Sequence, residues 1–352
     1  MKILFLTQRV DLNDDLLGFV HGWLERLAAR VEKVSVVALG VGEYRLPQNV
    51  RVFSLGKEKI VYHSLRKIKY LAGFFKYLWV LRQDYDLVFV HMNKEYVILG
   101  GLFWWLMSKK IILWYNHRAG NSWTRLACAL ADKIFYTSNF SFVAKLKKAE
   151  IMPAGIDTVL FRKNESVVKI PRSILYLGRI SPIKNVETLV EAAKILDQKD
   201  VDFVLNILGG TSARDERYFE KLKSTASAIS PAKVNFLPEV PNYQAPGVFN
   251  KNEIVVNLTN SGSLDKSLLE AMACENAVIL SNLFFKDSLP RNLLFEERNA
   301  RDLSEKLVNV LNLSASEKGE MGKKLRVYVL ENQSLDALVE KLIKNFKELL
   351  HE

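Results

Sequence analysis

Short runs of apolar residues alternate along the chain with longer segments in which apolar residues recur every three to four positions. The short runs are typical of strands buried on both faces of a parallel sheet, and the longer segments are typical of helices that cover such a sheet. This alternation predicts an α/β fold with parallel sheets. In the first half we expect strands at 2–7, 34–39, 52–55, 86–91, 110–115 and 133–137, and helices at 18–30, 63–82, 96–107, 126–131 and 138–148.

The pattern changes after Ile151. Residues 152–157 (MPAGID) are rich in turn formers, the segment after them is polar, and a second α/β series then begins. We therefore predict two domains, 1–165 and 166–335, and a final helix over 336–352 that could pack back on the first domain. The second series predicts strands at 173–177, 203–208, 234–237, 254–258 and 277–280, and helices at 186–196, 215–228, 268–273, 300–311 and 334–350.

The charge of the chain narrows the class of partner. The 352 residues carry a formal net charge of +11, which implies an anionic partner such as nucleotide phosphates, a lipid headgroup surface or nucleic acid. No zinc-finger spacing, RNP-like motif or isolated helix-turn-helix occurs in the sequence, so nucleic acid is not expected.

Several features favour a cytoplasmic location. Cys128 and Cys274 both lie in apolar helical patterns, which are typical of buried free thiols in a reducing compartment. Lys2 is followed at once by an apolar strand, with no signal-peptide cleavage site. The longest apolar run, 97–107, is shorter than the roughly 20 residues that a membrane-spanning helix needs.

Gly178, Arg179 and Lys184 lie where an apolar strand ends and a helix is about to begin. Glycine allows a close turn, Arg179 could bind a phosphate through two parallel hydrogen bonds, and Lys184 adds a second positive charge. The helix after Asn185 would add backbone amide donors at the same place. Spacing alone also allows a second interpretation, in which both cations are merely solvated on a surface loop.

A second candidate lies between Asn257 and Asn282, where a buried strand is followed by a polar loop of small residues and a short helix. This is where α/β folds bind anions and nucleotides, because the first amides of a helix have no intrahelical partner. The helix is apolar except for Glu270. Its carboxylate could accept hydrogen bonds from ribose hydroxyls, or it could be an ordinary exposed helix residue.

Both stretches resemble motifs of the family 4 glycosyltransferases, which have the GT-B architecture. The family's G-R-x4-K segment is matched by Gly178, Arg179 and Lys184, and the second half of its Glu-x7-Glu segment, ending in L-E-A-M-A, is matched by 269–273. The resemblance covers nearly the whole chain. It implies two Rossmann-like domains that face each other across a cleft, and a retaining transfer of a sugar from a nucleotide-diphospho-sugar to a glycan or lipid-linked acceptor, without a cofactor or a catalytic metal.

The resemblance also assigns roles within these motifs. Arg179 and Lys184 would neutralise the donor diphosphate as it leaves, an electrostatic contribution that grows in the transition state. Glu270 would accept hydrogen bonds from the nucleotide ribose.

Three further places resemble the family. Residues 154–161 are similar to its inter-domain segment, and 237–242 to its turn beside the nucleotide base, so the backbone at Val240 and Pro241 would contact the base. His117 ends a predicted strand of the first half, and a histidine at the matching place in the family lies beside the donor sugar. The sequence itself leaves another interpretation, a histidine that simply packs at a strand end.

The chain departs from the family at the first glutamate of Glu-x7-Glu, whose position is taken by Gly262. In the family that glutamate contacts the donor-sugar hydroxyls. The next residues, Ser263, Leu264 and Asp265, are expected beside the donor, and Asp265 could take over the missing contact or could only cap the following helix. A catalytically weak nucleotide-sugar-binding or scaffold protein is therefore the alternative to an enzyme, and a sugar-nucleotide epimerase is a third, less supported interpretation.

The polar loop 11–15 contains Asp11, Asn13, Asp14 and Asp15, where the family has a glycine-rich loop. It could bind acceptor hydroxyls at the carboxyl edge of the sheet, or it could be a solvated loop that caps the helix starting near Gly18.

The expected helix 63–82 combines cations with aromatic residues. It could lie on an anionic lipid surface with Phe74, Phe75, Tyr77 and Trp79 partly inserted, or it could be a core helix whose lysines are exposed. We favour association with the inner face of the membrane, because each cation near anionic lipid contributes about 1 kcal/mol. The basic residues of this region are Lys57, Lys59, Arg66, Lys67, Lys69, Lys76 and Arg82.

Overall fold

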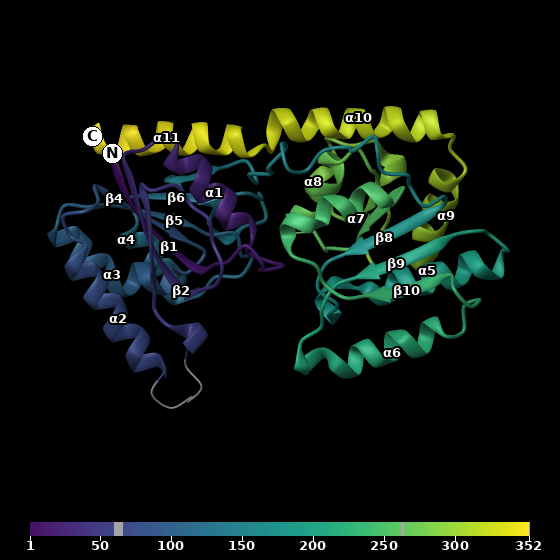
Figure 1. Cartoon of the computed structure of the whole chain (residues 1–352), viewed down its shortest axis with the longest axis horizontal. Coiled ribbons are helices and arrows are strands. Elements are labelled where there is room, and N and C mark those ends of the chain that lie inside the picture. The colour runs from purple at the N-terminus through teal and green to yellow at the C-terminus, as the bar shows by residue number, and fades with distance from the viewer. Residues whose placement is uncertain (60–65, 262–263, 352) are drawn as a thin grey trace. The chain divides into compact units, whose positions relative to one another are not determined.

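The computed structural model describes residues 1–59, 66–261 and 264–351. The chain divides into two compact units (Figure 1). Unit 1 comprises residues 1–155, 241–243 and 335–352, and unit 2 comprises 156–240 and 244–334. The division after Gly155 falls ten residues before the boundary expected from the sequence, within the turn-rich segment where the hydrophobic pattern changes.

Unit 1 contains a seven-stranded parallel sheet in the order β3-β2-β1-β4-β5-β6-β7. The apolar β1 is central, and its Phe5 lies opposite Val36 of β2 and Phe89 of β4. The expected α/β fold with parallel sheets is therefore confirmed. The strands are β1 Lys2–Val10, β2 Lys33–Val41, β3 Val50–Ser54, β4 Leu87–His91, β5 Lys110–Trp114, β6 Lys133–Tyr136 and β7 Ala149–Ile151.

The helices of unit 1 cover the two faces of this sheet. The connections through α2, α3 and α4 all run toward β7, whereas the connection through α1 runs the other way, so right-handed crossovers place the two groups on opposite faces. The cores agree, because Phe74 and Trp104 pack on one face and Trp23 and Phe346 on the other. The helices are α1 Phe19–Ala28, α2 Arg66–Val80, α3 Lys94–Leu106, α4 Ser122–Leu130 and α11 Leu335–His351.

The helix expected at 138–148 is wrong. That segment forms only a 3-10 turn, Phe142–Lys145, before β7. The hydroxyl of Ser138 accepts a hydrogen bond from the backbone amide of Phe140, and the hydroxyl of Ser141 donates to the carbonyl of Tyr115. Serine side chains that bond to nearby backbone in this way compete with a helix.

Unit 2 contains a five-stranded parallel sheet in the order β10-β9-β8-β11-β12. Its strands are β8 Ser173–Leu177, β9 Val204–Leu208, β10 Val234–Leu237, β11 Ile254–Asn257 and β12 Ala277–Leu280. Its helices are α5 Val186–Gln198, α6 Glu216–Ala226, α7 Ala245–Lys251, α8 Lys266–Ala273, α9 Ala300–Leu311 and α10 Ala315–Asn332. Short 3-10 turns occur at Lys57–Lys59, Pro182–Lys184, Ala213–Asp215, Asn242–Gln244, Leu283–Phe285 and Arg291–Leu293.

Helices α7 and α10 were not predicted from the sequence. In α10 the apolar pattern is interrupted by glycines, and Gly322 packs so tightly that a Cβ atom there would lie 2.2 Å from the carbonyl oxygen of Glu275. A different signal marks its start. Ser314 and Glu317 form a capping box, in which each side chain accepts a hydrogen bond from the other residue's backbone amide.

Candidate active site

The first candidate motif lies at the carboxyl edge of the unit 2 sheet, directly after β8. The chain leaving β8 at Gly178 touches the chain leaving the neighbouring β9 at Gly209. A Cβ atom on Gly209 would lie 2.0 Å from the carbonyl oxygen of Gly178, and the Gly178 amide donates to the Leu208 carbonyl at 3.0 Å. Glycine is needed at this close approach, which fixes where the residue after Gly178 starts.

Arg179 presents its side chain to solvent from a fixed backbone. The Tyr176 hydroxyl donates to its carbonyl oxygen at 3.0 Å, and the next amide, of Ile180, donates to the Gly210 carbonyl at 2.8 Å. Among the described residues, the guanidinium has no hydrogen-bond or ion-pair partner. Its five donors are thus available to an anion.

Lys184 lies in the 3-10 turn Pro182–Lys184, and its ammonium is already paired. Its Nζ atom is 2.5 Å from Oδ2 of Asp265 and 3.2 Å from the hydroxyl oxygen of Thr259. Asn185 makes a second link to the same loop, because its Nδ2 atom donates to Oδ1 of Asn260 at 2.5 Å. These contacts bring the two sequence motifs together at one edge of the sheet.

Asp265 is the N-cap of α8, with its Oδ1 atom accepting hydrogen bonds from the amide and the hydroxyl of Ser267. Its Oδ2 atom accepts from Lys184 and from the Thr259 hydroxyl at 2.7 Å. Burial alone would raise the pKa of Asp265, but the Lys184 charge and these hydrogen bonds hold it well below its usual range. The carboxylate is therefore ionised and its oxygens are engaged within the protein.

Glu270 is only 4% exposed, in the middle of the fully buried segment 268–273 of α8. The interpretation of Glu270 as an ordinary exposed helix residue is therefore wrong. Lys266 lies one turn before it, where burial lowers the pKa of the ammonium and the Glu270 charge partly opposes that shift. A carboxylate buried at this depth is stable only with hydrogen-bond donors or a positive charge next to it.

The remaining candidates of unit 2 are less informative. Leu264 is half-buried just before the N-cap of α8, while Gly262 and Ser263 lie outside the described residues. Val240 and Pro241 are half-buried and follow β10, two strands away from β8 in the sheet order. Pro241 itself is grouped with unit 1.

His117 follows β5 at the carboxyl edge of the unit 1 sheet and is exposed. Its ring lies 5.3 Å from the ring of Tyr115, and its carbonyl oxygen accepts a hydrogen bond from the Phe142 amide at 3.0 Å. Backbone contacts thus fix the residue while its ring stays accessible.

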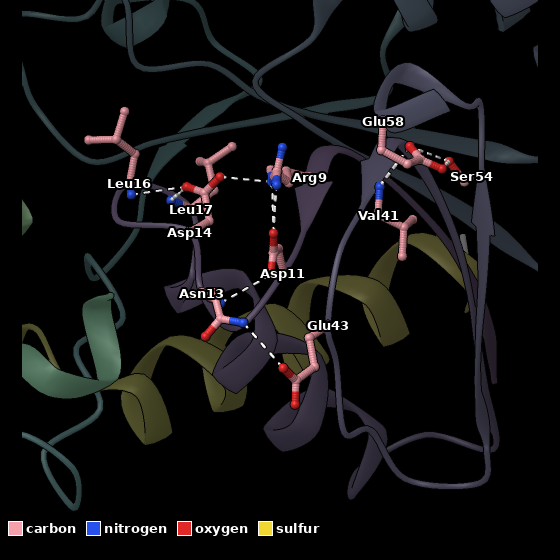
Figure 2. Close-up of polar contacts among 10 residues, drawn as sticks. All are labelled: Arg9, Asp11, Asn13, Asp14, Leu16, Leu17, Val41, Glu43, Ser54 and Glu58. Atoms are coloured by element: carbon pink, nitrogen blue, oxygen red, sulfur yellow. Dashed lines mark hydrogen bonds and ion pairs between the residues drawn. The ribbon is translucent and has the colours of Figure 1, made fainter. Parts of the chain in front are cut away.

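The acidic loop of unit 1 is neutralised by Arg9, a residue that the sequence analysis did not single out (Figure 2). Its guanidinium is 2.6 Å from Asp11 and 2.9 Å from Asp14. Asp14 also accepts hydrogen bonds from the amides of Leu16 and Leu17, just before α1. Asp14 thus orders the turn before α1, but the helix cap expected from this loop is absent, since the N-cap Gly18 receives no side-chain hydrogen bond. The signal for the ion pairs in the sequence was an arginine two residues before the first aspartate.

The described residues were also compared with the requirements of a metal site and of a membrane-spanning helix. No group of three or more His, Cys, Asp or Glu side chains is placed to hold a metal ion. No helix in the described part of the chain has both the length and the apolar character to cross a bilayer.

Comparison with known proteins points to the same part of the chain as the site described above. Residues 171–313, which include Arg179, Lys184 and Glu270, match the family model described as glycosyl transferases group 1. A D-inositol 3-phosphate glycosyltransferase of Pseudarthrobacter chlorophenolicus is 31% identical over 150 residues, which cover 40% of this chain and 35% of that protein. The chain thus matches about a third of the length of this relative.

Two solved structures are similar over their full length. Sucrose-phosphate synthase from Thermosynechococcus elongatus has a TM-score of 0.79 at 17% identity and covers 100% of each chain. Anabaena Alr3699/HepE in complex with UDP-glucose has a TM-score of 0.78 at 13% identity, covering 99% of this chain and 100% of the other. Residues 171–313 are therefore similar to the group 1 glycosyltransferases, in agreement with the motif resemblance, and the chain has the GT-B fold.

Proposed function

We propose that this chain is a retaining, metal-independent glycosyltransferase that moves a sugar from a nucleotide-diphospho-sugar to a glycan or lipid-linked acceptor. The observation that carries the proposal is the Arg179 guanidinium, which is exposed and has no partner among the residues that the structure describes. It follows β8, beside the strand β11 that leads to Asp265, the partner of Lys184, and to the buried Glu270 of α8. The comparisons support a sugar-nucleotide donor, since Anabaena Alr3699/HepE was solved with UDP and with UDP-glucose.

The reaction needs positive charge where the diphosphate leaves. Arg179 can bind the diphosphate at once, because it has no internal partner among the described residues. Lys184 is offset by Asp265 in the free protein, so that a bound phosphate would share its ammonium with the carboxylate. Fixed cations of this kind stabilise charge that develops in the transition state, which is the role a metal ion has in other transferases.

The two units would divide the work. Unit 2 would bind the donor, with Glu270 accepting hydrogen bonds from the ribose hydroxyls, and unit 1 would bind the acceptor. The backbone at Val240 and Pro241 would contact the base, and His117 would contact the donor sugar. We place the protein in the cytoplasm, at the inner face of the membrane where a lipid-linked acceptor would be found.

A second candidate function is a nucleotide-sugar-binding or scaffold protein with weak catalysis. The observation that favours it is Gly262, which takes the place of the glutamate that contacts the donor sugar in the family. Asp265 is a poor substitute for that glutamate, because its oxygens already accept hydrogen bonds from Lys184, Thr259 and Ser267.

The test compares Arg179→Ala and Lys184→Ala with wild type. Release of the nucleoside diphosphate is measured over a panel of nucleotide-sugars, with glycan and lipid extracts as acceptors, and binding is measured by calorimetry. Turnover should fall about 10²–10³-fold in each variant, as when one charge-stabilising donor is removed from other enzymes. Lys199→Ala, an exposed cation at the far end of α5, is the matched control and should leave turnover unchanged.

The outcomes separate the two functions. Turnover that is unchanged in both Arg179→Ala and Lys184→Ala would refute the enzyme assignment at this site. Binding of a nucleotide-sugar by wild type without release in the presence of any acceptor would favour the scaffold protein.

A further inference from the structure

The outer surface of α2, α3 and α4 is unusually apolar for an exposed helical layer. Of the 25 exposed large hydrophobic side chains among the described residues, 11 lie on these three helices. They include all three of the chain's exposed tryptophans, Trp79 on α2, Trp105 on α3 and Trp123 on α4, which are between 60% and 71% exposed. We call this surface the three-helix face. The other members are Ile68, Leu71, Phe75, Val80, Leu99, Leu102, Leu106 and Leu126.

The members of this face point the same way because of the sheet topology. The three helices connect β3 to β4, β4 to β5 and β5 to β6, so they lie side by side on one face of the sheet (Figure 1). Within α2, Ile68, Leu71, Phe75 and Trp79 follow one another at steps of three or four residues, which places them on one stripe. Trp105 and Leu102 form the corresponding stripe of α3.

This surface differs from the one expected from the sequence. Phe74, expected as a membrane anchor, is only 1% exposed and packs on Tyr96 in the core. Tyr77, also expected as an anchor, is half-buried. Phe75 and Trp79 are exposed as expected. The apolar contribution of α3 and α4 was missed, because in the sequence these helices look like ordinary core helices.

The same region carries most of the chain's excess positive charge. Between Lys57 and Arg125 the sequence has 12 Lys and Arg and 4 Asp and Glu, a net of +8 out of +11 for the whole chain. Lys69 and Lys76 are exposed on the flank of the α2 stripe. The Arg82 guanidinium lies 4.3 Å from the centre of the Trp79 ring, so a cation and an anchor are joined at the end of α2.

Two hollows open between the helices of this face. One, of about 470 Å³, lies between α2 and α3, with Phe74, Tyr96 and Leu99 in its wall and Lys67 beside them. The other, of about 560 Å³, lies beside α4, where Cys128, Phe142 and Leu146 form an apolar wall. Arg125, Lys147 and Lys148 line the second hollow as well. The second hollow therefore combines an apolar interior with positive charge, whereas in the first Glu95 offsets Lys67.

We infer that the three-helix face docks on an anionic lipid bilayer. Tryptophan side chains are favoured at the level of lipid headgroups, and lysines and arginines around them bind anionic headgroups. A protein partner would bury the apolar area but would need acidic groups placed to meet Lys69, Lys76 and Arg82, whereas an anionic bilayer matches the apolar area and the cations at once. The surface lies wholly in unit 1 and does not depend on the proposed transferase chemistry.

The test measures binding to phosphatidylcholine vesicles with and without phosphatidylglycerol, by flotation at low and high salt. Wild type should float with the anionic vesicles at low salt and less so at high salt. Leu102→Ser combined with Trp105→Ser removes two anchors, and Lys69→Glu combined with Lys76→Glu reverses two charges. Each pair should weaken partitioning by roughly tenfold or more.

Matched controls come from exposed residues of unit 2. Val168→Ser with Val327→Ser, and Lys199→Glu with Lys221→Glu, change the same chemistry elsewhere and should bind as wild type does. Far-UV circular dichroism confirms that the variants fold, and release of nucleoside diphosphate from a soluble donor should be unchanged in all of them. A failure of the transferase proposal would thus leave the vesicle result standing.

Two results would overturn the inference. One is wild-type protein that ignores phosphatidylglycerol, or face variants that bind as well as the controls do. The other is a concentration-dependent dimer of wild type, seen by analytical ultracentrifugation without lipid, that Leu102→Ser with Trp105→Ser abolishes. In that case the face is an interface between two copies of this chain.

Discussion

Asp265 and Lys184 together decide how much charge the free site presents. The sequence suggested Asp265 as a substitute for a missing donor-sugar glutamate, whereas in the structure the carboxylate holds the Lys184 ammonium. With Thr259 and Ser267 also donating to it, the carboxylate has little capacity left for sugar hydroxyls. We therefore regard Asp265 as a positioning residue that aims Lys184, while Arg179 is free to bind the donor first.

Replacing Asp265 by Asn tests this role, because the amide keeps the cap of α8 but loses the charge. The free energy of unfolding at pH 7 should fall by about 2 kcal/mol, less than the 3–5 kcal/mol of a fully buried pair, since both side chains keep some solvent contact. Under the proposed function, in which Lys184 stabilises the leaving diphosphate, turnover should fall as well, with kcat affected more than KM. Urea unfolding and steady-state kinetics measure the two effects.

A second ion pair supplies the control for Asp265→Asn. Lys233 and Asp197 are 2.8 Å apart with nearly the same side-chain exposure, but at the opposite edge of the unit 2 sheet. Asp197→Asn should destabilise the protein without changing turnover. Equal kinetic effects of the two variants would contradict a positioning role for Asp265.

The pH dependence of Asp265→Asn follows from the sign of the shift. The pKa of Asp265 in the folded protein lies below its ordinary value of 3.8, so the stabilisation is complete above that pH and is lost as the pH falls toward the folded-state pKa. The stability difference between wild type and Asp265→Asn should be full at pH 7 and shrink below about pH 4. A difference that grows on acidification would show that the ion pair is not its source.

Individual candidate residues could be named from the sequence only where a motif marks them. Arg179, Lys184 and Glu270 are candidates because their spacing along the chain matches a family pattern. Arg9 was missed, although it is only two residues from Asp11, because the ion pair depends on how the loop folds back on the end of β1. The pairing of Lys184 with Asp265 was missed for a similar reason, since 81 residues separate them in sequence.

At the scale of elements, the sequence predicted helices correctly where the local pattern was regular, and failed where that pattern was weak or misleading. Helix α9 was predicted with its observed bounds because its apolar residues recur regularly between an N-cap and a loop. Helix α10 was missed because its apolar pattern is weak and it contains glycines, even though it has 18 residues. The segment 138–148 was wrongly predicted as a helix because its apolar residues have helical spacing. Its serines bond to the backbone instead.

The capping box of α10 makes a prediction about stability. Ser314→Ala removes the hydroxyl that accepts from the Glu317 amide, and should lower the free energy of unfolding by about 1 kcal/mol. Ser316→Ala, an exposed serine in the first turn of the same helix, is the control and should cost little or nothing. Urea titration followed by far-UV circular dichroism measures both, and equal losses would mean that the box contributes nothing.

At the scale of the whole molecule, the chain builds two compact units, and its last helix returns to the first one. The last helix, α11, adds Leu338, Leu342 and Phe346 to the core that β1 and α1 begin. The sequence analysis expected a C-terminal helix that could pack back on the first domain, and α11 lies in unit 1. A helical apolar stripe by itself does not say which domain it covers. Such long-range closure is set by tertiary packing between the two ends of the chain.

The packing of α11 in unit 1 leads to a prediction of how each unit responds to mutation. Phe346 is fully buried in unit 1, 5.7 Å from the ring of Phe89, and Phe249 is fully buried in unit 2 near Phe161. Each Phe→Ala change should lower the free energy of unfolding of its own unit by about 3–5 kcal/mol.

All six tryptophans lie in unit 1, so tryptophan fluorescence during urea unfolding reports on that unit, whereas far-UV circular dichroism reports on both. Phe346→Ala should move the fluorescence midpoint to lower urea, and Phe249→Ala should move only the circular dichroism transition. Identical shifts of both signals in both variants would mean that units 1 and 2 unfold together in one cooperative transition.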